Sequence, residues 1–292
     1  MRTWTRSAAA SGIAAMAGMC VLLCLSGCGG NEQAEIEMQR ATQEETAVFP
    51  ATEQPRLVVE TASGDITIRA DGSDDAIRVT ATLRAEAESL EAATTRVEEL
   101  SAEMVQDGDT ITLRFDADPD VAVTGAVDFD VTLPARTAID ATSGGGSIAV
   151  FDTTSSVKAR TARGDLEIHI SEGLVDAETE AGDILFVGQF ESSLDNPTEH
   201  RLATQDGLIE AFLDPTYFKL EATAPNGKIS AEELYFFGGR SDTRWSLMIR
   251  PTAASSAGAD RPPNTKVFIH NETGDIRLVH IDVYGRMPTE AE

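Results

Sequence analysis

Apolar and polar residues alternate with a period of two along much of the chain after residue 56. Successive side chains of a β-strand point to opposite faces, so this alternation predicts strands with one buried face. The pattern therefore indicates a domain built mainly from short strands. The first alternating segments are LVVETASGDITIRA (57–70), AIRVTATLRA (76–85), DTITLRFDAD (109–118) and VDFDVTLP (127–134).

Residues 86–105 follow a different spacing, in which apolar side chains recur every three or four positions. These positions are Leu90, Ala93, Val97, Leu100 and Met104. The spacing predicts an amphipathic helix of about five turns, which the Asp-Gly pair at 107–108 would end. We expect this helix to cover one end of the domain and to shield a sheet edge from pairing with another chain.

One pattern of residues recurs seven times, and each copy is centred on a glycine. Apolar residues stand seven and five positions before the glycine, and two and four positions after it. His200 is the polar exception, and the neighbouring Leu202 predicts a local shift of register in that copy. A Thr, Ser, Asn or Ala stands three positions before each glycine. The seven glycines are Gly64, Gly146, Gly164, Gly182, Gly207, Gly227 and Gly274.

This spacing describes one strand, a sharp turn at the glycine, and a second strand. Between Gly146 and Gly227 the glycines follow one another at intervals of 18, 18, 25 and 20 residues. Such a short unit cannot bury its apolar face alone, so the units must stack, and their hydroxyl and amide side chains can then form ladders. The sequence predicts an all-β fold, a stacked β-solenoid similar to a right-handed parallel β-helix, whose last coil begins at Gly274.

The first 28 residues form a targeting signal. Arg2 and Arg6 precede an uncharged apolar run from Ala8 to Leu25, and the chain then reads Leu-Ser-Gly-Cys up to Cys28. This combination resembles the signal of bacterial lipoproteins, in which the chain is cut before the cysteine and the cysteine is acylated. The resemblance implies lipidation of Cys28 and anchoring to a membrane, facing away from the cytoplasm. An ordinary secretory signal and a single spanning anchor are the alternatives.

The remaining cysteines, Cys20 and Cys24, lie inside this signal, so a chain starting at Cys28 would have neither a disulfide nor a thiolate metal site. Residues 29–55 are polar and rich in Glu and Gln, which is typical of a tether. The expected organisation is a lipoprotein signal peptide (1–27), a flexible tether (28–55), N-terminal strands with a capping helix (56–133), and β-solenoid repeats (134–285) with an insertion at about 236–265.

The charge of the chain limits its partners. Acidic side chains outnumber basic ones by 49 to 23, which gives a formal net charge of −26. This balance argues against direct binding to nucleic acid or to an anionic lipid surface. Loose binding of divalent cations is compatible with it.

The order of these features resembles a known family. A leading xVxTxxGDIxI segment is followed by LPARTAIDATSGGGSIAV (133–150) and by tandem units of the form VxAxTxxGDIxI. This order is similar to the putative-adhesin family of bacterial β-helical proteins, a domain of unknown function, over about residues 57–281. The resemblance implies a β-helical fold, and the family label implies adhesion. The chain departs from a regular array at NPTEH (196–200) and in the interval of 47 positions from Gly227 to Gly274.

The repeated Gly-Asp pair is the main candidate for chemistry. Asp165 and Asp183 would stand on adjacent coils, about 4.8 Å apart if they follow the strand spacing. Paired carboxylates at that distance could bind a cation or act in a glycosidase. The equivalent positions also hold Ser147, Leu208 and Lys228, so the repeat does not require an acid. We interpret the aspartates mainly as solvent-facing turn residues.

Histidines and aromatic residues are the other candidates for a functional site. The four histidines are spread along the chain without metal-ligand spacing, so no metal site is predicted. Tyr235, Phe236, Phe237 and Trp245 form the densest aromatic cluster. We interpret them as an inserted hairpin that packs on the domain, with a carbohydrate- or protein-binding patch as the alternative.

The sequence thus predicts a non-enzymatic, lipid-anchored protein of the bacterial cell envelope without a cofactor. Its β-solenoid would bind or scaffold surface proteins or glycans. The alternative is a β-helical polysaccharide hydrolase or lyase that uses stacked aspartates such as Asp165 and Asp183. A third interpretation is an accessory in envelope stress signalling.

Overall fold

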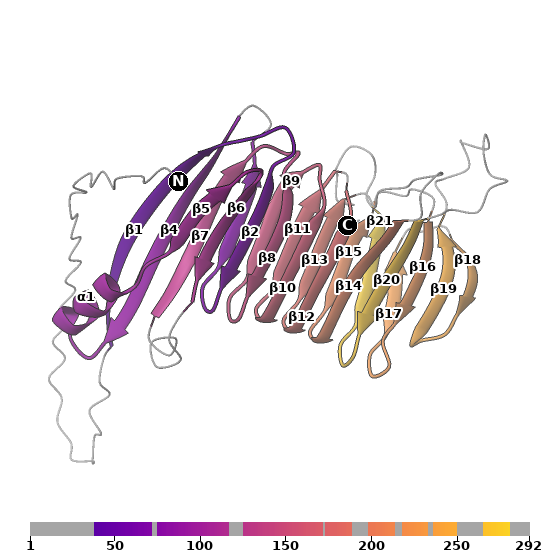
Figure 1. Cartoon of the computed structure of the whole chain (residues 1–292). Coiled ribbons are helices and arrows are strands. Elements are labelled where there is room, and N and C mark those ends of the chain that lie inside the picture. The colour runs from indigo at the N-terminus through magenta and orange to yellow at the C-terminus, as the bar shows by residue number, and fades with distance from the viewer. Residues whose placement is uncertain are drawn as a thin grey trace, which may run out of the picture. The chain divides into compact units, whose positions relative to one another are not determined.

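The structure is all-β with one short helix, and its strands form two large mixed sheets (Figure 1). It is a computed structural model, and the signal segment with Cys28 lies outside the residues it describes. No helix among the described residues is long and apolar enough to cross a membrane. The described residues are 38–71, 75–116, 125–171, 173–188, 198–213, 218–232, 236–249 and 265–280.

Neither sheet closes on itself. The ten-stranded sheet has the order β1 (Gln39–Pro50), β4 (Ala76–Ala87), β7 (Gly125–Leu133), β3 (Ile66–Ala70), β9 (Ile148–Thr153), β11 (Leu166–Ile170), β13 (Ile184–Gly188), β15 (Ile209–Leu213), β21 (Ile276–His280) and β17 (Ile229–Glu232). The eleven-stranded sheet has the order β18 (Phe236–Arg240), β19 (Arg244–Ile249), β16 (Phe218–Thr223), β20 (Thr265–Asn271), β14 (Thr198–Asp206), β12 (Val175–Ala181), β10 (Val157–Arg163), β8 (Ala138–Ser143), β2 (Arg56–Thr61), β6 (Thr110–Phe115) and β5 (Glu103–Asp107).

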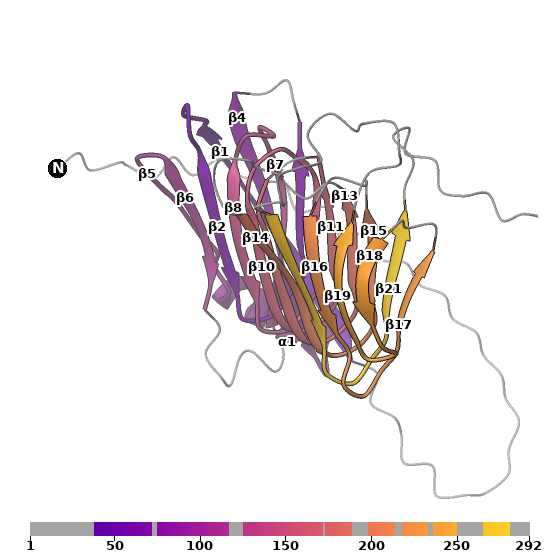
Figure 2. The same cartoon turned by 90° about the vertical axis from the view of Figure 1, so that its right-hand side faces the viewer.

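From β8 to β15 the chain visits the two sheets alternately, and the strands within each sheet run parallel. Equivalent positions of the repeated pattern lie opposite one another: Val157 pairs with both Ile139 and Val175. The apolar positions on each side of the glycine point inward, and Ala159 and Ile168 are fully buried. Figure 2 shows the two sheets as two layers, so the core lies between them.

His200 lies in this core without a shift of register, and the shift expected from the sequence is wrong. It pairs with Val267, while Leu202 pairs with Ala177 and Ile269. The His200 side chain is fully buried, and its Nδ1 accepts a hydrogen bond of 3.3 Å from the backbone N–H of Val175. An imidazole can therefore occupy an apolar position of the repeat because a backbone donor satisfies its ring nitrogen.

The strands do not stack in chain order at either end. β2 and β3 lie between β6 and β7 on one side and β8 and β9 on the other. β20 and β21, which carry the Gly274 repeat, lie between β14 and β15 and the earlier strands β16 and β17. The Gly274 repeat is therefore internal, whereas the sequence order placed it last. Pairing requires only matching strand edges, so sequence proximity does not fix the stacking order.

The first strand corrects the predicted tether at residues 28–55. Residues 39–50 form β1, which pairs antiparallel with β4 over its whole length of 12 residues. Its inward side holds few apolar groups, among them Ala41, which is buried, and Phe49, which is partly buried. The backbone pairing with β4 supplies the order that this polar sequence does not signal on its own.

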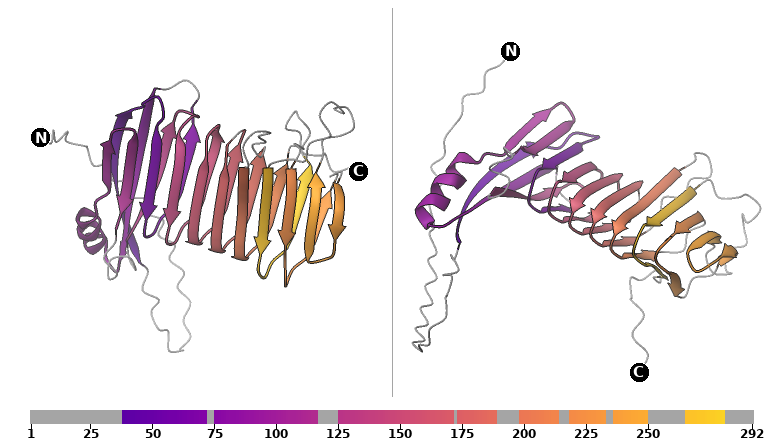
Figure 3. Two further views of the ribbon diagram at one scale, coloured as in Figure 1. Left: turned by 45° about the vertical axis from the view of Figure 1, so that its right-hand side comes forward. Right: turned by 90° about the horizontal axis from the view of Figure 1, so that it is seen from below.

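The helix is shorter than the predicted 86–105. Helix α1 spans Leu90–Glu99, with the Ser89 side chain accepting a hydrogen bond from the backbone N–H of Ala92 at its start. Residues 103–107 are instead β5, which forms a hairpin with β6. Buried Ala93 and Val97 place α1 against β1 and β4, at the end of the sheets where these strands lie (Figure 3). The interval of four between Leu100 and Met104 fits both a helix and a strand, which explains the error.

The aromatic segment extends the eleven-stranded sheet. β18 and β19 form an antiparallel hairpin next to β16. Trp245 lies in the core at 5% exposure, and its Nε1 donates to the backbone carbonyl of Ser241 at 2.8 Å. Tyr235 lies outside the described residues, as do the side chains of Phe236 and Phe237. The described part of the predicted insertion is therefore a packed hairpin.

Candidate functional site

The glycines of the repeat stack directly on one another. A Cβ built on Gly164 would overlap the carbonyl oxygen of Gly146, and one built on Gly182 would overlap that of Gly164. Gly164 has φ of +138° and Gly182 has φ of +155°, which side chains disfavour. The same overlap holds for Gly207 against Gly182 and for Gly274 against Gly207. Glycine is therefore required for close approach at all of these positions, and for backbone conformation at Gly164, Gly182 and Gly207.

In five of the seven repeats, the residue three positions before the glycine donates to the carbonyl of a glycine in the neighbouring repeat. The hydroxyl of Thr161 donates to the carbonyl of Gly146 at 2.9 Å, and that of Thr179 donates to Gly164 at 3.1 Å. Asn271 donates in the same way to Gly207 at 2.7 Å. Equivalent bonds join Ser143 to Gly64 and Thr204 to Gly182. The ladder expected from the sequence thus runs from side chain to backbone, and it satisfies carbonyls at the turn.

The aspartates form a second ladder along the same turns. Oδ1 of Asp165 accepts from the backbone N–H of Asp183 at 2.8 Å, and Oδ1 of Asp183 accepts from that of Leu208 at 2.7 Å. Oδ1 of Asp65 accepts from the backbone N–H of Ser147, and Oδ1 of Asp275 accepts from that of Lys228, each at 2.8 Å. The structure therefore uses the acid to join repeats, a role that the interpretation as a solvent-facing turn residue did not include.

In this series each side chain accepts from the amide of the next repeat, and the series is interrupted at Leu208. The Ser147 hydroxyl accepts from the backbone N–H of Asp165 at 3.2 Å, so serine can replace the acid. Leu208 offers no side-chain acceptor to its neighbour, the Asp275 turn. At the other end, Oδ1 of Asp128 accepts from the N–H of Asp65 at 2.9 Å and from Arg84 at 2.5 Å. Asp128 was missed from the sequence because no Gly-Asp pair marks it.

Two further glycines that lie in close contact with the preceding repeat were also missed. Gly173 has φ of +117° and Gly188 has φ of +149°. A Cβ on Gly173 would overlap the Ser155 carbonyl, and one on Gly188 would overlap the Ile170 carbonyl. Gly173 lies after β11, whereas Gly188 is the last residue of β13, so the two glycines do not align in the sequence pattern.

Asp165 and Asp183 are thus adjacent, as their spacing predicts, and both are exposed. One oxygen of each carboxylate is engaged by a backbone amide, and cation binding there stays a prediction. No group of three or more His, Cys, Asp or Glu side chains suited to a metal occurs within the described residues. His169 instead contacts Glu167 at 2.9 Å, and His270 contacts Thr223 at 2.7 Å.

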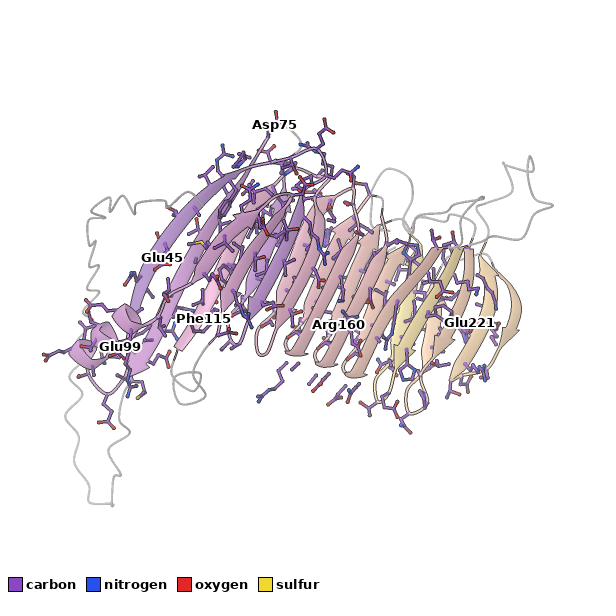
Figure 4. The ribbon with its side chains drawn as sticks, in the orientation of Figure 1. Glu45, Asp75, Glu99, Phe115, Arg160 and Glu221 are labelled. Atoms are coloured by element: carbon purple, nitrogen blue, oxygen red, sulfur yellow. The ribbon has the colours of Figure 1, made fainter. Side chains whose placement is uncertain are left out.

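The outer face of the eleven-stranded sheet carries paired opposite charges. Arg160 contacts Asp176 at 2.5 Å and Glu178 at 3.7 Å, and Arg201 contacts Glu178 at 3.3 Å (Arg160 and Glu221 are labelled in Figure 4). Further along, the hydrogen bond from Lys219 at 2.5 Å holds the pKa of Glu221 below its ordinary value. The ion pairs of Arg160 and Arg201 link neighbouring strands across the face, whereas Lys219 and Glu221 lie two residues apart on β16.

Comparison with known proteins gives distant structural resemblances. No family model and no curated protein matches the chain. A "putative cell adhesion protein" from Clostridium sporogenes is similar at 10% identity and a TM-score of 0.45, covering 82% of this chain and 100% of that one. A "putative adhesin" from Bacteroides fragilis is similar at 10% identity and a TM-score of 0.38, covering 81% of this chain and 97% of that one. Such distant likeness does not assign a function.

Proposed function

We propose that this chain is a lipid-anchored protein of the bacterial cell envelope whose body is a non-catalytic β-solenoid that binds or scaffolds other surface molecules. In this proposal each repeat forms one right-handed coil, with one strand in each sheet. The in-register pairing of Val157 with Ile139 and Val175 supports the coil arrangement. Right-handed crossover between parallel strands is the strong general rule.

The hydrogen bonds that the aspartates accept from backbone amides favour a scaffold over an enzyme. Asp165 and Asp183 are the closest equivalent of a catalytic carboxylate pair. One oxygen of each accepts a hydrogen bond from the backbone of the next repeat. A hydrolase or lyase needs acids whose oxygens reach the substrate. Acids that join repeats serve instead to build two long outer faces, where proteins or glycans could bind.

Lipid anchoring rests on the signal sequence and on Cys28. The first described strand begins at Gln39, so ten residues lie between it and Cys28. A chain of that length spans at most about 40 Å, which would keep the body near the membrane. One acylated residue with several chains would hold it there stably.

The anchoring is tested by growing cells with a clickable fatty acid. We expect label and membrane association for the unaltered chain, loss of both for Cys28→Ala, and retention of both for the control Cys24→Ala. Equal labelling and equal membrane association of Cys28→Ala would overturn the lipid anchor.

Binding is tested separately by crosslinking in intact cells from outward positions on the two sheets, such as Thr142 and Glu210. We expect reproducible crosslinks to one class of surface protein or glycan. Cleavage of an envelope polysaccharide that is lost in Asp165→Asn with Asp183→Asn, while the fold persists, would favour the enzyme instead.

A further inference from the structure

The ten-stranded sheet ends in a long strand edge. β1 is its terminal strand, and its 12 residues pair with β4 without a bulge or break. The opposite edge of β1 pairs with no strand in the part of the chain that the structure describes. The other terminal strands are much shorter: β17 has 4 residues, while β5 and β18 have 5 each. A long regular edge presents a row of backbone donors and acceptors to another strand.

Exposed apolar side chains gather on the elements at this end. Five large hydrophobic residues of the described chain are strongly exposed, and four of them lie on or beside β1, α1 and β5. Met38 and Val48 are at 47% and 65% exposure near the two ends of β1, and Leu90 on α1 is at 59%. The distribution distinguishes this end from the rest of the surface.

We infer that a second copy of this chain pairs with this edge, so that the two β1 strands run antiparallel about a two-fold axis at Thr42. An axis perpendicular to the sheet keeps each side chain on its own face. Residues equally far from Thr42 then stand opposite one another. Arg40 faces Glu44 of the second copy, and the symmetry repeats this contact.

The other contacts of this register are also compatible. On the inner face, Gln39 stands opposite Glu45 of the second copy (Glu45 is labelled on β1 in Figure 4). On the outer face, Met38 lies diagonal to Val48 of the second copy, within reach of a long side chain. Two of the exposed apolar groups thereby cover each other at both ends of the contact.

Neighbouring registers lack this complementarity. An axis at Gln43 places Arg40 opposite Thr46, with no acid to meet it. Axes at Glu44 or Glu45 place two like carboxylates directly opposite, which is unfavourable. Arg40 already contacts Glu86 of its own chain at 2.6 Å, so in the Thr42 register it stands between two acids. The sequence of β1 therefore selects one register, and pairing would join two ten-stranded sheets edge to edge.

Disulfide formation tests the register in the full chain, extracted with detergent. The two copies of Thr42 are opposite each other, so Thr42→Cys should give a disulfide-linked dimer under mild oxidation. Thr46→Cys is the control, because it faces Met38 and its own copies lie far apart. The unaltered chain measures the background from its native cysteines. Equal crosslinking of Thr42→Cys and Thr46→Cys, or none above background, would overturn the register.

Charge exchange tests the contact without a new thiol. Glu44→Arg places Arg opposite Arg40, and Arg40→Glu places Glu opposite Glu44, so each variant alone should dimerise about tenfold or more weakly in sedimentation velocity. Mixing the two variants restores both opposite-charge contacts and should restore the dimer. Glu180→Arg, on β12 of the other sheet, changes the charge equally and should leave dimerisation unchanged. A monomeric unaltered chain, or a mixture no more dimeric than its components, would disprove the inference.

Discussion

The Asp183 carboxylate accepts a hydrogen bond of 2.7 Å from the backbone N–H of Leu208, which lies 25 residues further along the chain. The bond crosses from one repeat to the next at the turn where both glycines are in contact. It belongs to a series in which an acid of one repeat holds the amide of its neighbour. The Gly-Asp pair therefore encodes a turn and its attachment to the next turn together.

Removing the Asp183 acceptor should weaken this attachment. We expect Asp183→Ala to lower the free energy of unfolding by about 1 kcal/mol, because the Leu208 amide loses its partner. Asp183→Asn keeps an acceptor oxygen and should lose less. Urea denaturation measures both, with Glu180→Ala on the preceding strand β12 as a control for removal of an acid. An Asn variant as unstable as the Ala variant would contradict the hydrogen-bond explanation.

A methyl group at the stacked corner should be far more damaging. Gly164→Ala forces a Cβ into the Gly146 carbonyl at φ of +138°, so we expect a loss of about 3 kcal/mol or more. Gly145→Ala is the matched control, because no atom lies within 4 Å of a Cβ there. Thermal unfolding compares the two variants. Similar melting temperatures would show that the close stacking at Gly164 is not required.

The internal place of β20 and β21 has a distinct consequence for truncation. Ending the chain after residue 264 removes two strands that separate β14 and β15 from β16 and β17. We expect residues 218–249 to become sensitive to limited proteolysis, because β16 and β17 lose their parallel partners. A chain ending after residue 280 is the control. Protection of 218–249 in the shorter chain would mean that β16 can dock directly on β14.

The Lys219–Glu221 pair should appear in the pH dependence of the protein. Lys219 lowers the folded-state pKa of Glu221 below its ordinary value of 4.5. The pair therefore stabilises the fold fully above pH 4.5, and this contribution is lost as the pH falls through the lowered pKa. Carboxyl NMR titration should give a higher midpoint for Glu221 in Lys219→Met. Lys266→Met should raise it less, and an unchanged midpoint in Lys219→Met would exclude the pair as the cause.

The local pattern was sufficient to predict the repeated core and its corners. Ala159 and Ile168 could be assigned to the interior because a strand exposes alternate side chains. The Gly164 turn could be assigned because glycine tolerates the conformation that the spacing demands. These features depend on residues within one repeat, where sequence periodicity is informative.

Features that depend on distant partners could not be predicted in this way. β1 is polar, and its pairing with β4, between residues 26 to 48 positions apart, gives no local signal. The role of Asp165 depends on the amide of Asp183, which only the stacked structure brings within reach. The position of β20 depends on which strand edge is open, and the repeat pattern is the same for every order of stacking.

The position of β20 and β21 between earlier strands also restricts the order in which the strands can pair. The strands from β16 to β19 are synthesised before β20 and β21, which join β16 and β17 to the rest of the two sheets. Until β20 and β21 emerge, the edge of β16 opposite β19 must either stay unpaired or pair provisionally with β14 and then be displaced. The last strands to be synthesised, β20 and β21, must therefore be inserted between strands that were synthesised before them.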